Sequence, residues 1–593
     1  MVIALTYSKY KDAAPEDTIK RIRDCFSAVG VELRHTVTKR MDNIYSSVVL
    51  DPIGGWSTAG KGTTEEYCLA SAYAEAMEHF CNYCAYDFTC IEKSARDYLG
   101  FDRYPDEKII PMAKIRDVHP TVLKEITEAY SMEGDCCDEE KLAKTWSLFL
   151  NSDTMSLVPY YSVRKKETVY LPEAVVGKLC GSTGGGAGNT AEEAIGHGLD
   201  EISERYVKYV IYSEELTPPK ISHEYIREVC PDLNQIIDNI QNDNRYSVLV
   251  LDGSLGRGYP VVAVCLIDRN THSYMVNFGA HPCFQIALER CFTEMFQFMN
   301  LGQTQSIHHK NMEKWTSFVN SEGIHSVRNW VSLLRDDTGK IPDAFFSGEP
   351  SWEFVPWGVY SDYSNRFGMK LQIDNFLRDG AEDIYIRDFS FLDFPVYRIY
   401  IPKLSVSHYT VCDRILKHYQ AGKEIVESIV GGSKMDLTLN DRTILEDVFS
   451  PKSYVDSWII RNIKESYFDL VYAFLIKDKA GKDEALELIA DLNEDVAQAI
   501  REEEHMIVLK RTAEERNRII RLFYGEFVAN VVAAWRSKNS FVQLLLLLKE
   551  QRLVGPKRMK KYTEDVQSLH KRFKECMVRN TPNQLRIGMI VGC

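Results

Sequence analysis

Two pairs of glutamates give the sequence its most specific chemical signal. Glu75 and Glu78 lie three residues apart in ASAYAEAMEHF, and Glu201 and Glu204 repeat that spacing in IGHGLDEISERY. Residues three apart share one face of a helix, so each pair presents two carboxylates together. Such a pair can hold a metal ion directly, and its small or apolar neighbours suit helices packed inside a domain. Most helical glutamates face water, so a solvent-exposed stripe is the alternative interpretation.

Carboxylates gathered inside a protein need compensation, because like charges removed from water are costly. Magnesium bound to a triphosphate would supply it, since the cations are then shared between carboxylate and phosphate oxygens. A third helix candidate, HPCFQIALERCFTEMFQF, adds Arg290 and Glu294 four residues apart and again on one face. The residues thus suggest a metal-dependent site that takes Mg2+ together with a triphosphate.

The two glutamate pairs belong to an internal repeat. KGTTEEYCLASAYAEAMEHFCNY aligns without a gap with AGNTAEEAIGHGLDEISERYVKY, so that Glu75 meets Glu201 at an offset of 201 − 75 = 126 residues. Each copy has a glycine-containing lead and then a threonine, Thr64 or Thr190, of the kind that caps a helix start. The glutamates follow about three turns later. We therefore expect a duplicated loop and helix unit.

The lead of the first copy resembles a phosphate-binding P-loop without matching it. Residues 55–61 fit G-x-x-x-x-G-K, but Gly62 stands where a P-loop needs Ser or Thr to ligate magnesium. A P-loop also leaves a strand directly, whereas Pro52 interrupts the chain after the apolar run 44–50. We therefore expect the helix that follows, and not the loop, to supply the metal ligands.

The composition is that of a globular protein of at least two domains, with 593 residues, 45% hydrophobic and 26% charged. The formal net charge of −14 argues against direct binding of nucleic acid or of an anionic membrane. The apolar stretch 541–548 is too short to span a bilayer, and the first residues do not form a signal peptide. We expect a cytoplasmic protein with no membrane association.

Two local features have ordinary explanations. Cys81 and Cys84 form a C-x-x-C motif, but only Cys90 follows nearby, so we interpret them as helix-packing thiols and not as a zinc site. Residues 552–579 are locally basic and could face RNA or an acidic partner. A solvated helix face is the commoner cause of such a stretch.

The strand and helix signals divide the chain near residue 405. Strand-like apolar runs alternate with helical stretches before it, at 246–255, 259–267, 273–280 and 393–402. This alternation predicts an α/β or α+β sheet domain over residues 1–405. After about 410 the strand signals fade, and 483–511 shows the 3.6-residue recurrence of amphipathic helices. We predict an all-α C-terminal domain over residues 406–593.

On these residues the chain resembles the YcaO proteins, a family of ATP-dependent enzymes that activate peptide amides. In order, the resemblance is carried by STAGKGTTEE with SAYAEAMEHF, GAGNTAEEAIGHGLDEISERYVK, DGSLGRGYPVVAVCLI and FGAHPCFQIALERCFTE. With KDAAPEDT near the start, it covers most of residues 1–405. It implies a YcaO-type sheet domain with packed helices, followed in stand-alone members by a tetratricopeptide-like helical domain. The tetratricopeptide sequence pattern is not evident after 410, so the C-terminal match is architectural.

The resemblance implies a nucleotide site in which glutamates from several helices hold magnesium against the phosphates. The magnesium-side carboxylates would be Glu75, Glu78, Glu193, Glu201 and Glu204. Arg205 and Arg290 would contact phosphate, Glu294 would complete the group, and Glu75, Glu201 and Arg290 would carry the catalysis. The other nucleotide contacts would be Lys11, Thr18 and Asn189. Ser71 lies one turn before Glu75 and joins the site on its spacing.

In the family's reaction a nucleophile attacks the carbonyl carbon of a backbone amide, the amide oxygen takes the γ-phosphate during or after that attack, and the oxygen then leaves as phosphate. An adjacent Cys or Ser gives an azoline and external sulfide gives a thioamide, and both reactions rely on positioning and charge stabilisation. Stand-alone members are usually associated with methylthiolation of an aspartate on a small-subunit ribosomal protein, and the family is commonly dimeric. The resemblance thus implies an accessory role to a methylthiotransferase, with a peptide or protein substrate, in a homodimer.

Two departures from the family pattern bear on the function. His79 stands where the repeat has Arg205 and where the family often has arginine, and Pro582 stands alone where azoline-forming members have a proline-rich tail. The second departure disfavours azoline formation. The alternatives are a peptide natural-product cyclodehydratase or thioamide synthetase, and a non-catalytic scaffold whose helical domain binds partners. Clustered glutamates with paired arginines favour an enzyme over a scaffold.

Replacing Lys61 with Ala should weaken nucleotide binding less than replacing Arg290 with Ala, because we give Lys61 no P-loop role and expect Arg290 to contact phosphate. A Walker lysine would behave in the opposite way. Titration calorimetry with Mg-ATP compares the two variants. A Lys61→Ala variant that loses all hydrolysis, beside a mild Arg290→Ala variant, would restore the P-loop interpretation.

Overall fold

The computed structural model describes residues 10–41, 43–52, 56–82, 104–129, 138–150, 153–242, 244–271, 273–297, 341–360, 362–405, 412–449, 468–550, 568–569 and 571–592. Cys84, Cys90 and the basic residues 552–567 lie outside these ranges. Cys81 is buried in an apolar cluster, as expected for a helix-packing thiol. Among the described helices, none has the length and apolar character needed to cross a bilayer.

The first layer combines two helices with a three-stranded antiparallel sheet. α1 (Pro15–Val29) is followed by β1 (Arg34–Met41), β2 (Ile44–Leu50) and β3 (Ser57–Gly62), which pair in that order, and then by α2 (Glu65–Cys81). The G-K-G of the apparent phosphate loop therefore lies on a strand and not in a loop. Gly60 lets α2 approach β3 closely, since a Cβ atom there would fall 2.2 Å from the carbonyl oxygen of Cys68.

A second strand and helix repeat this contact. β7 (Gly185–Ala187) precedes α7 (Ala191–Ser213), and Gly186 occupies the position of Gly60 in the repeat. A Cβ atom at Gly186 would fall 2.1 Å from the carbonyl oxygen of Ala194, the counterpart of Cys68. Only glycine permits this spacing between helix and strand in either copy.

The threonine caps of the two helices are also equivalent. The Thr64 side chain accepts a hydrogen bond from the amide of Tyr67, and that of Thr190 accepts one from the amide of Glu193, each at 3.2 Å. Each bond satisfies a backbone donor that a helix start leaves without an internal partner. The predicted duplicated unit is confirmed, with a strand in place of the expected loop.

The largest sheet has six strands, whose pairs are all antiparallel. Its order is β4-β5-β11-β12-β7, and β6 pairs with β5. The strands besides β7 are β4 (Lys108–Pro111), β5 (Thr154–Ser162), β6 (Glu167–Pro172), β11 (Tyr385–Asp388) and β12 (Val396–Tyr400). Because β7 pairs with β12, the second repeat unit belongs to this sheet.

A third, antiparallel sheet has the order β10-β9-β8 and carries α10 (Phe284–Met295) on β9 and β10. Its strands are β8 (Tyr246–Asp252), β9 (Val261–Asp268) and β10 (Ser273–Ala280). The four strands predicted near 246, 259, 273 and 393 are thus confirmed as β8, β9, β10 and β12. The remaining elements before residue 405 are η3 (Met112–Asp117), α4 (Pro120–Ala129), α5 (Glu139–Leu150), α6 (Glu173–Cys180), α8 (His223–Val229), α9 (Pro231–Gln241), α13 (Ala344–Ser347) and α14 (Asn365–Arg378).

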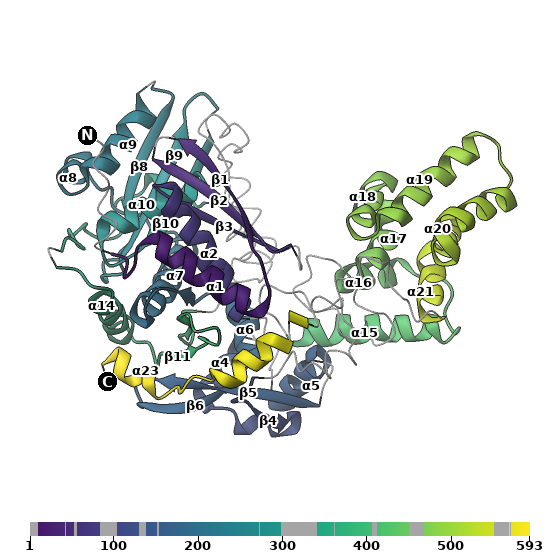
Figure 1. Cartoon of the computed structure of the whole chain (residues 1–593), viewed down its shortest axis with the longest axis horizontal. Coiled ribbons are helices and arrows are strands. Elements are labelled where there is room, and N and C mark those ends of the chain that lie inside the picture. Colours follow the sequence, from purple (N-terminus) through teal and green to yellow (C-terminus); the bar gives the residue numbers. More distant parts are fainter. Residues whose placement is uncertain are drawn as a thin grey trace.

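Beyond residue 410 the described elements are helices. They are α15 (Cys412–Val430), α16 (Leu439–Phe449), α17 (Phe468–Ala480), α18 (Lys482–Leu492), α19 (Glu494–Val508), α20 (Ala513–Arg536), α21 (Ser540–Glu550) and α23 (Arg586–Val591). From α15 to α21 each helix packs on the next, and α16–α21 stand apart from the sheets (Figure 1). The mixed α/β fold is confirmed, and helices after 410 are as expected. The division at residue 405 stays a prediction.

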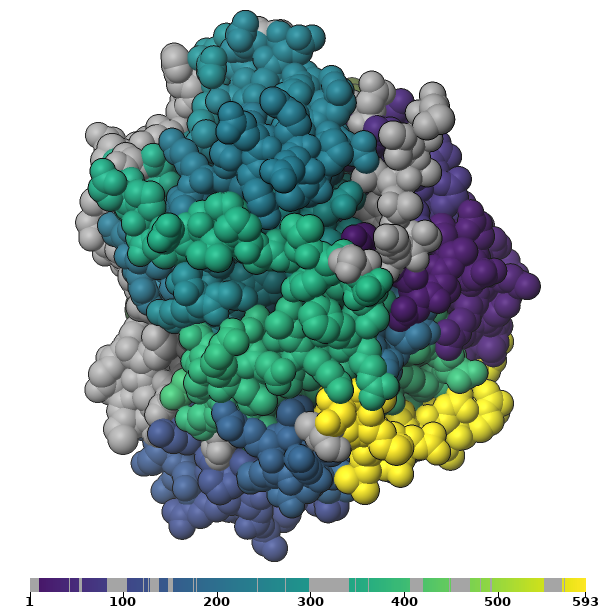
Figure 2. Space-filling model, turned by 90° about the vertical axis from the view of Figure 1, so that its left-hand side faces the viewer, coloured from purple at the N-terminus to yellow at the C-terminus, as the bar shows by residue number. Residues whose placement is uncertain are grey.

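The end of the chain returns to the first layer. Helical residues 571–579 bury Phe573 and Met577 in the apolar core of α1 and α2, where the Phe573 ring meets that of Phe80 with centroids 4.8 Å apart. The C-terminal residues accordingly lie next to the N-terminal ones on the face shown in Figure 2. The described basic side chains of this helix are exposed, as expected for a solvated face: Lys571, Arg572, Lys574 and Arg579.

Phe573→Ala should lower the free energy of unfolding by about 3–5 kcal/mol, the usual cost of emptying a buried phenylalanine site. Chemical denaturation of the full chain measures the loss. Lys574→Ala, an exposed change on the same helix, is the matched control and should stay within about 0.5 kcal/mol. Equal effects of the two variants would show that the returning helix adds nothing to the first core.

Candidate functional site

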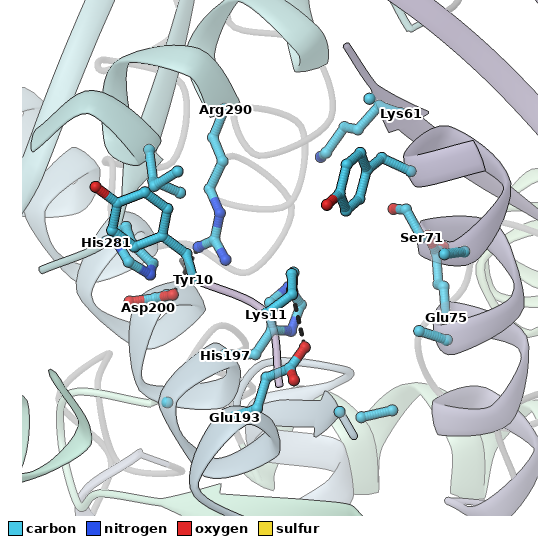
Figure 3. Close-up of a pocket in the computed structure, with 18 of the residues that line it drawn as sticks. Tyr10, Lys11, Lys61, Ser71, Glu75, Glu193, His197, Asp200, His281 and Arg290 are labelled. Carbon is cyan, nitrogen blue, oxygen red and sulfur yellow. Dashed lines mark hydrogen bonds and ion pairs between the residues drawn. The ribbon is translucent and has the colours of Figure 1, made fainter. Parts of the chain in front are cut away.

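A cavity of about 510 Å3 lies where α2, α7 and α10 meet residues 10–18 (Figure 3). Eleven of the twelve predicted site residues line it: Lys11, Thr18, Ser71, Glu75, Glu78, Asn189, Glu193, Glu201, Arg205, Arg290 and Glu294. Glu204 does not line the cavity, but its charge acts to raise the pKa of Lys61, and Lys61 does line it. The three helices identified from sequence therefore converge on one space, and the individual roles of their residues stay predictions.

Burial controls the protonation of the carboxylates on α2. It raises the pKa of Glu75 to about 7, with Lys61 opposing the rise and Glu201 adding to it. Burial also raises the pKa of Glu78 well above its ordinary value, and Glu201 and Glu75 add to that rise. In the described ranges neither glutamate forms an ion pair. Both carboxylates therefore line the cavity without a bonded cation, Glu78 buried and Glu75 half-buried.

Glu204 on α7 is in a similar state. Burial raises its pKa, while Lys61 and Arg205 oppose the rise, and it too has no ion pair among the described residues. Carboxylate oxygens are the donors that Mg2+ prefers, so this set fits a magnesium ion in its chemistry. Within the part of the chain that the structure describes, no three His, Cys, Asp or Glu side chains already form a metal-binding group.

Four cations of the site, in contrast, are each paired with a carboxylate. The pairs are Lys11 Nζ with Glu193 Oε1 at 3.0 Å, a nitrogen of Arg205 with Glu201 Oε1 at 2.8 Å, a nitrogen of Arg290 with Asp200 Oδ2 at 2.7 Å, and Lys61 with Glu294. The side chains of Lys61 and Arg290 both end in the space between α2 and α10 (Figure 3). An anion entering that space meets positive charge from two sides.

The N-terminal segment binds the start of the second repeat unit. The amide of Asp12 donates to Glu193 Oε2 at 3.2 Å, and the Thr18 hydroxyl lies 2.8 Å from Asn189 Oδ1. Burial raises the pKa of Glu193, but Lys11 and the bonds from Asp12 and Asn189 outweigh it, so the pKa lies below its ordinary value. Glu193 is therefore a fixed anion that already has a cation, unlike Glu75 or Glu78.

The sequence did not single out several residues that complete the cavity. Asp200 holds Arg290 and accepts a hydrogen bond from Gln372 Nε2 at 3.0 Å, and burial raises its pKa to about 6 against the effect of Arg290. His197 and His281 also line the cavity, where burial and then Arg290 lower both pKa values well below the ordinary one. His197 lies four residues before Glu201, so helical spacing could have placed it on the same face.

Known proteins are similar to this chain over much of its length. A family model described as "YcaO cyclodehydratase, ATP-ad Mg2+-binding" matches residues 59–405. The chain is 29% identical to the ribosomal protein S12 methylthiotransferase accessory factor YcaO of Escherichia coli (strain K12), over 72% of this chain and 70% of that protein. It is 28% identical to a protein of Haemophilus influenzae, over 68% of this chain and 66% of the other.

Among solved structures, YcaO from Methanopyrus kandleri bound with AMPPCP and Mg2+ is 20% identical, covers 66% of this chain and 91% of its own, and superposes with a TM-score of 0.42. The family model alone spans more than half of the sequence and includes α2, α7 and α10. The protein is thus an ATP- and Mg2+-binding α/β protein. It belongs to the YcaO family.

Glu75→Gln and Glu201→Gln should each reduce ATP turnover by about a hundredfold or more, because a lost carboxylate misplaces charge where the phosphoryl group is transferred. Glutamine keeps the shape and helix propensity of glutamate, so the fold should stay intact. A coupled assay with magnesium measures turnover. Near-normal turnover with a large fall in Tm in both variants would make these glutamates structural.

The stability of the nucleotide-free Glu75→Gln variant should depend on pH in a defined direction. The Glu75 carboxyl has a pKa of about 7 in the folded protein, above its unfolded value of about 4.5, so its ionisation opposes folding as pH rises between these values. The cost is absent below pH 4.5 and complete above pH 7. Thermal unfolding should therefore show a gain in Tm for Glu75→Gln at pH 8 that disappears at pH 4.5.

Proposed function

We propose that the protein is an Mg-ATP-dependent enzyme that activates an amide or carbonyl oxygen of a peptide or protein by phosphorylation. One observation carries the proposal: Glu75, Glu78 and Glu204, which are buried or half-buried and form no direct ion pair among the described residues, adjoin a cavity that Arg205 and Arg290 also line. An empty arrangement of this kind is expensive in free energy. A ligand that brings both cations and phosphate oxygens satisfies the carboxylates and the arginines together.

The residues present fit magnesium in their chemistry. The carboxylates that would hold it are Glu75, Glu78, Glu193, Glu201 and Glu204. Of these, Glu75, Glu78 and Glu204 form no direct ion pair among the described residues. Bound magnesium supplies electrostatic stabilisation of the transferring phosphoryl group. The chain itself contributes the guanidinium groups of Arg205 and Arg290 for phosphate, and Lys11, Thr18 and Asn189 for the rest of the nucleotide.

The guanidinium groups are positioned in advance by their partners. Arg205 is held by Glu201 at 2.8 Å and Arg290 by Asp200 at 2.7 Å. Donors fixed in this way stabilise charge that develops on transfer without paying for reorientation during the reaction. His197 and His281 remain neutral beside them, which keeps further positive charge out of the space. This division suits phosphoryl transfer, in which positioning and charge stabilisation outweigh covalent chemistry by side chains.

For the biological role we propose an accessory function in aspartate methylthiolation of a small-subunit ribosomal protein, supported by the similarity to the Escherichia coli S12 methylthiotransferase accessory factor. The helices α15–α21, each packed on the next, support a tetratricopeptide-like partner-binding domain. A cytoplasmic homodimer is proposed with them, on the family resemblance. The methylthiotransferase and its ribosomal substrate would be the partners.

A second candidate function, peptide cyclodehydration or thioamide synthesis, is favoured by the description of the matching family model as a cyclodehydratase. Against azoline formation, α23 buries Ile587 and Val591 in the core around α7 and α14, and none of the described residues 571–592 lines the cavity. A neighbouring gene for a precursor peptide would favour this second function over the ribosomal role.

ATP should bind the purified protein only in the presence of magnesium, because without it the triphosphate meets unshielded glutamates. Titration calorimetry with ATP and Mg2+, and again with a chelator, tests this. Binding should fall at least about a hundredfold in the chelator, given the several carboxylates in the site. Tight ATP binding that the chelator leaves unchanged would exclude the metal and carboxylate site.

A further inference from the structure

The two repeat units differ in where they carry their cation. At the 126-residue offset, Lys61 of β3 corresponds to Ala187 of β7, and His79 of α2 corresponds to Arg205 of α7. The caps, the glycine contacts and the glutamates match in both units. The positive charge is thus on the helix in the second unit and on the strand in the first.

In the second unit the helical cation serves the helical glutamate directly. Arg205 lies four residues after Glu201 and binds its carboxylate at 2.8 Å. In the first unit Glu75 has the imidazole of His79 at the same spacing in place of a guanidinium group, and the described residues include no ion pair of His79 with Glu75. The charge that Glu201 obtains from its own helix must reach Glu75 from elsewhere.

Lys61 is placed to supply that charge. On β3, Gly60 and Gly62 face α2, which leaves Lys61 on the side of α10, where it forms an ion pair with Glu294. The end of α10 is held against β3 at this point, since Gln297 Nε2 donates to the carbonyl oxygen of Ala59 at 3.0 Å. Figure 3 shows the Lys61 side chain reaching into the cavity between α10 and the Glu75 side of α2.

The electrostatics agree with that position. Burial lowers the pKa of Lys61, while Glu204 and Glu75 are the strongest influences in the opposite direction. Lys61 lines the same cavity as Glu75 of α2, Glu201 of α7 and Glu294 of α10. The Lys61 side chain is still 31% exposed and faces the open cavity, so its ammonium group can move when a ligand enters.

We propose that Lys61 is a built-in counter-ion that takes the place of the missing helical arginine in the first repeat unit and competes with Mg2+ for the carboxylates of α2, α7 and α10. The inference rests on the proposed Mg-ATP site and assigns a positioning role to a lysine outside any P-loop. In the empty protein the ammonium group compensates the carboxylates. A divalent ion interacts with them more strongly than one tethered charge and so displaces it.

The first test is made on the nucleotide-free protein. Lys61→Met removes the charge and keeps an unbranched side chain that is one atom shorter, and Lys61→Arg keeps the charge. In chelator at pH 8, Lys61→Met should lower the Tm and Lys61→Arg should not. On titration with Mg2+ alone, Lys61→Met should bind about tenfold more tightly than the wild type, because a competing cation is gone.

Lys434→Met is the matched control for this experiment. Lys434 pairs with Asp441 at 2.6 Å and, like Lys61, has a 31% exposed side chain, but it does not line the cavity. Its replacement should leave the Mg2+ titration unchanged. An unchanged Mg2+ titration in Lys61→Met as well, together with a loss of ATP affinity as large as in Arg290→Ala, would overturn the proposal and make Lys61 a phosphate ligand.

The second test restores the charge at the place used by the other repeat unit. Lys61→Met/His79→Arg recreates the arrangement of Arg205 four residues after Glu201 and should recover the Tm in chelator. Lys61→Met/Glu294→Gln removes a carboxylate instead and should recover it too, which keeps the test valid if arginine does not fit at residue 79. If both double variants remain as unstable as Lys61→Met, Lys61 acts through packing and the proposal fails.

These readouts separate the counter-ion from the proposed function. If the wild type binds no Mg-ATP while the charge rescue succeeds, the proposed function fails and the counter-ion stands. If Mg-ATP binds and turns over while neither the Tm nor the Mg2+ titration responds to Lys61→Met, the counter-ion fails and the proposed function stands.

Discussion

The enclosure of several carboxylates between packed helices is the constraint on which the site depends. Each ionised glutamate in the interior costs free energy unless a cation lies close by, and the cost grows when two of them face one another. Glycines 60 and 186 determine how near α2 and α7 come to their strands, and the caps at Thr64 and Thr190 fix where both helices begin. Backbone geometry thereby sets the distances at which the charges must be balanced.

That balance is only partly reached inside the chain. Arg205, Arg290 and Lys11 each hold a carboxylate, so a phosphate approaching them has to share donors that are already engaged. The glutamates without a direct ion pair instead favour binding, because any cation that accompanies the phosphate stabilises them. Neither component alone suits the cavity, whereas nucleotide and metal together neutralise each other and both sets of side chains.

Sequence reasoning succeeded where the pattern was local or repeated. The ungapped repeat identified α2 and α7, the i and i+4 spacing identified α10, and the apolar runs identified β8, β9, β10 and β12. It did not single out Asp200, because an aspartate beside a glutamate pair looks like solvent-facing charge until its partner on α10 is known. Sequence reasoning placed Lys61 in a loop, because the G-K pattern at the end of a phosphate loop also occurs on this strand, and the sequence alone does not distinguish the two. Sequence reasoning treated the residues after 405 as one helical unit. The apolar periodicity of an amphipathic helix predicts that one face is buried, but it does not predict which elements that face packs against.

The return of residues 571–579 to the first core has a consequence for biosynthesis. Domains usually complete their cores in the order in which they leave the ribosome. Here Phe80 and its neighbours on α1 and α2 obtain Phe573 and Met577 only when almost the whole chain has been translated. The nascent chain must therefore carry an open apolar surface through most of its elongation, a period in which a chaperone would have a binding site that the finished protein has closed.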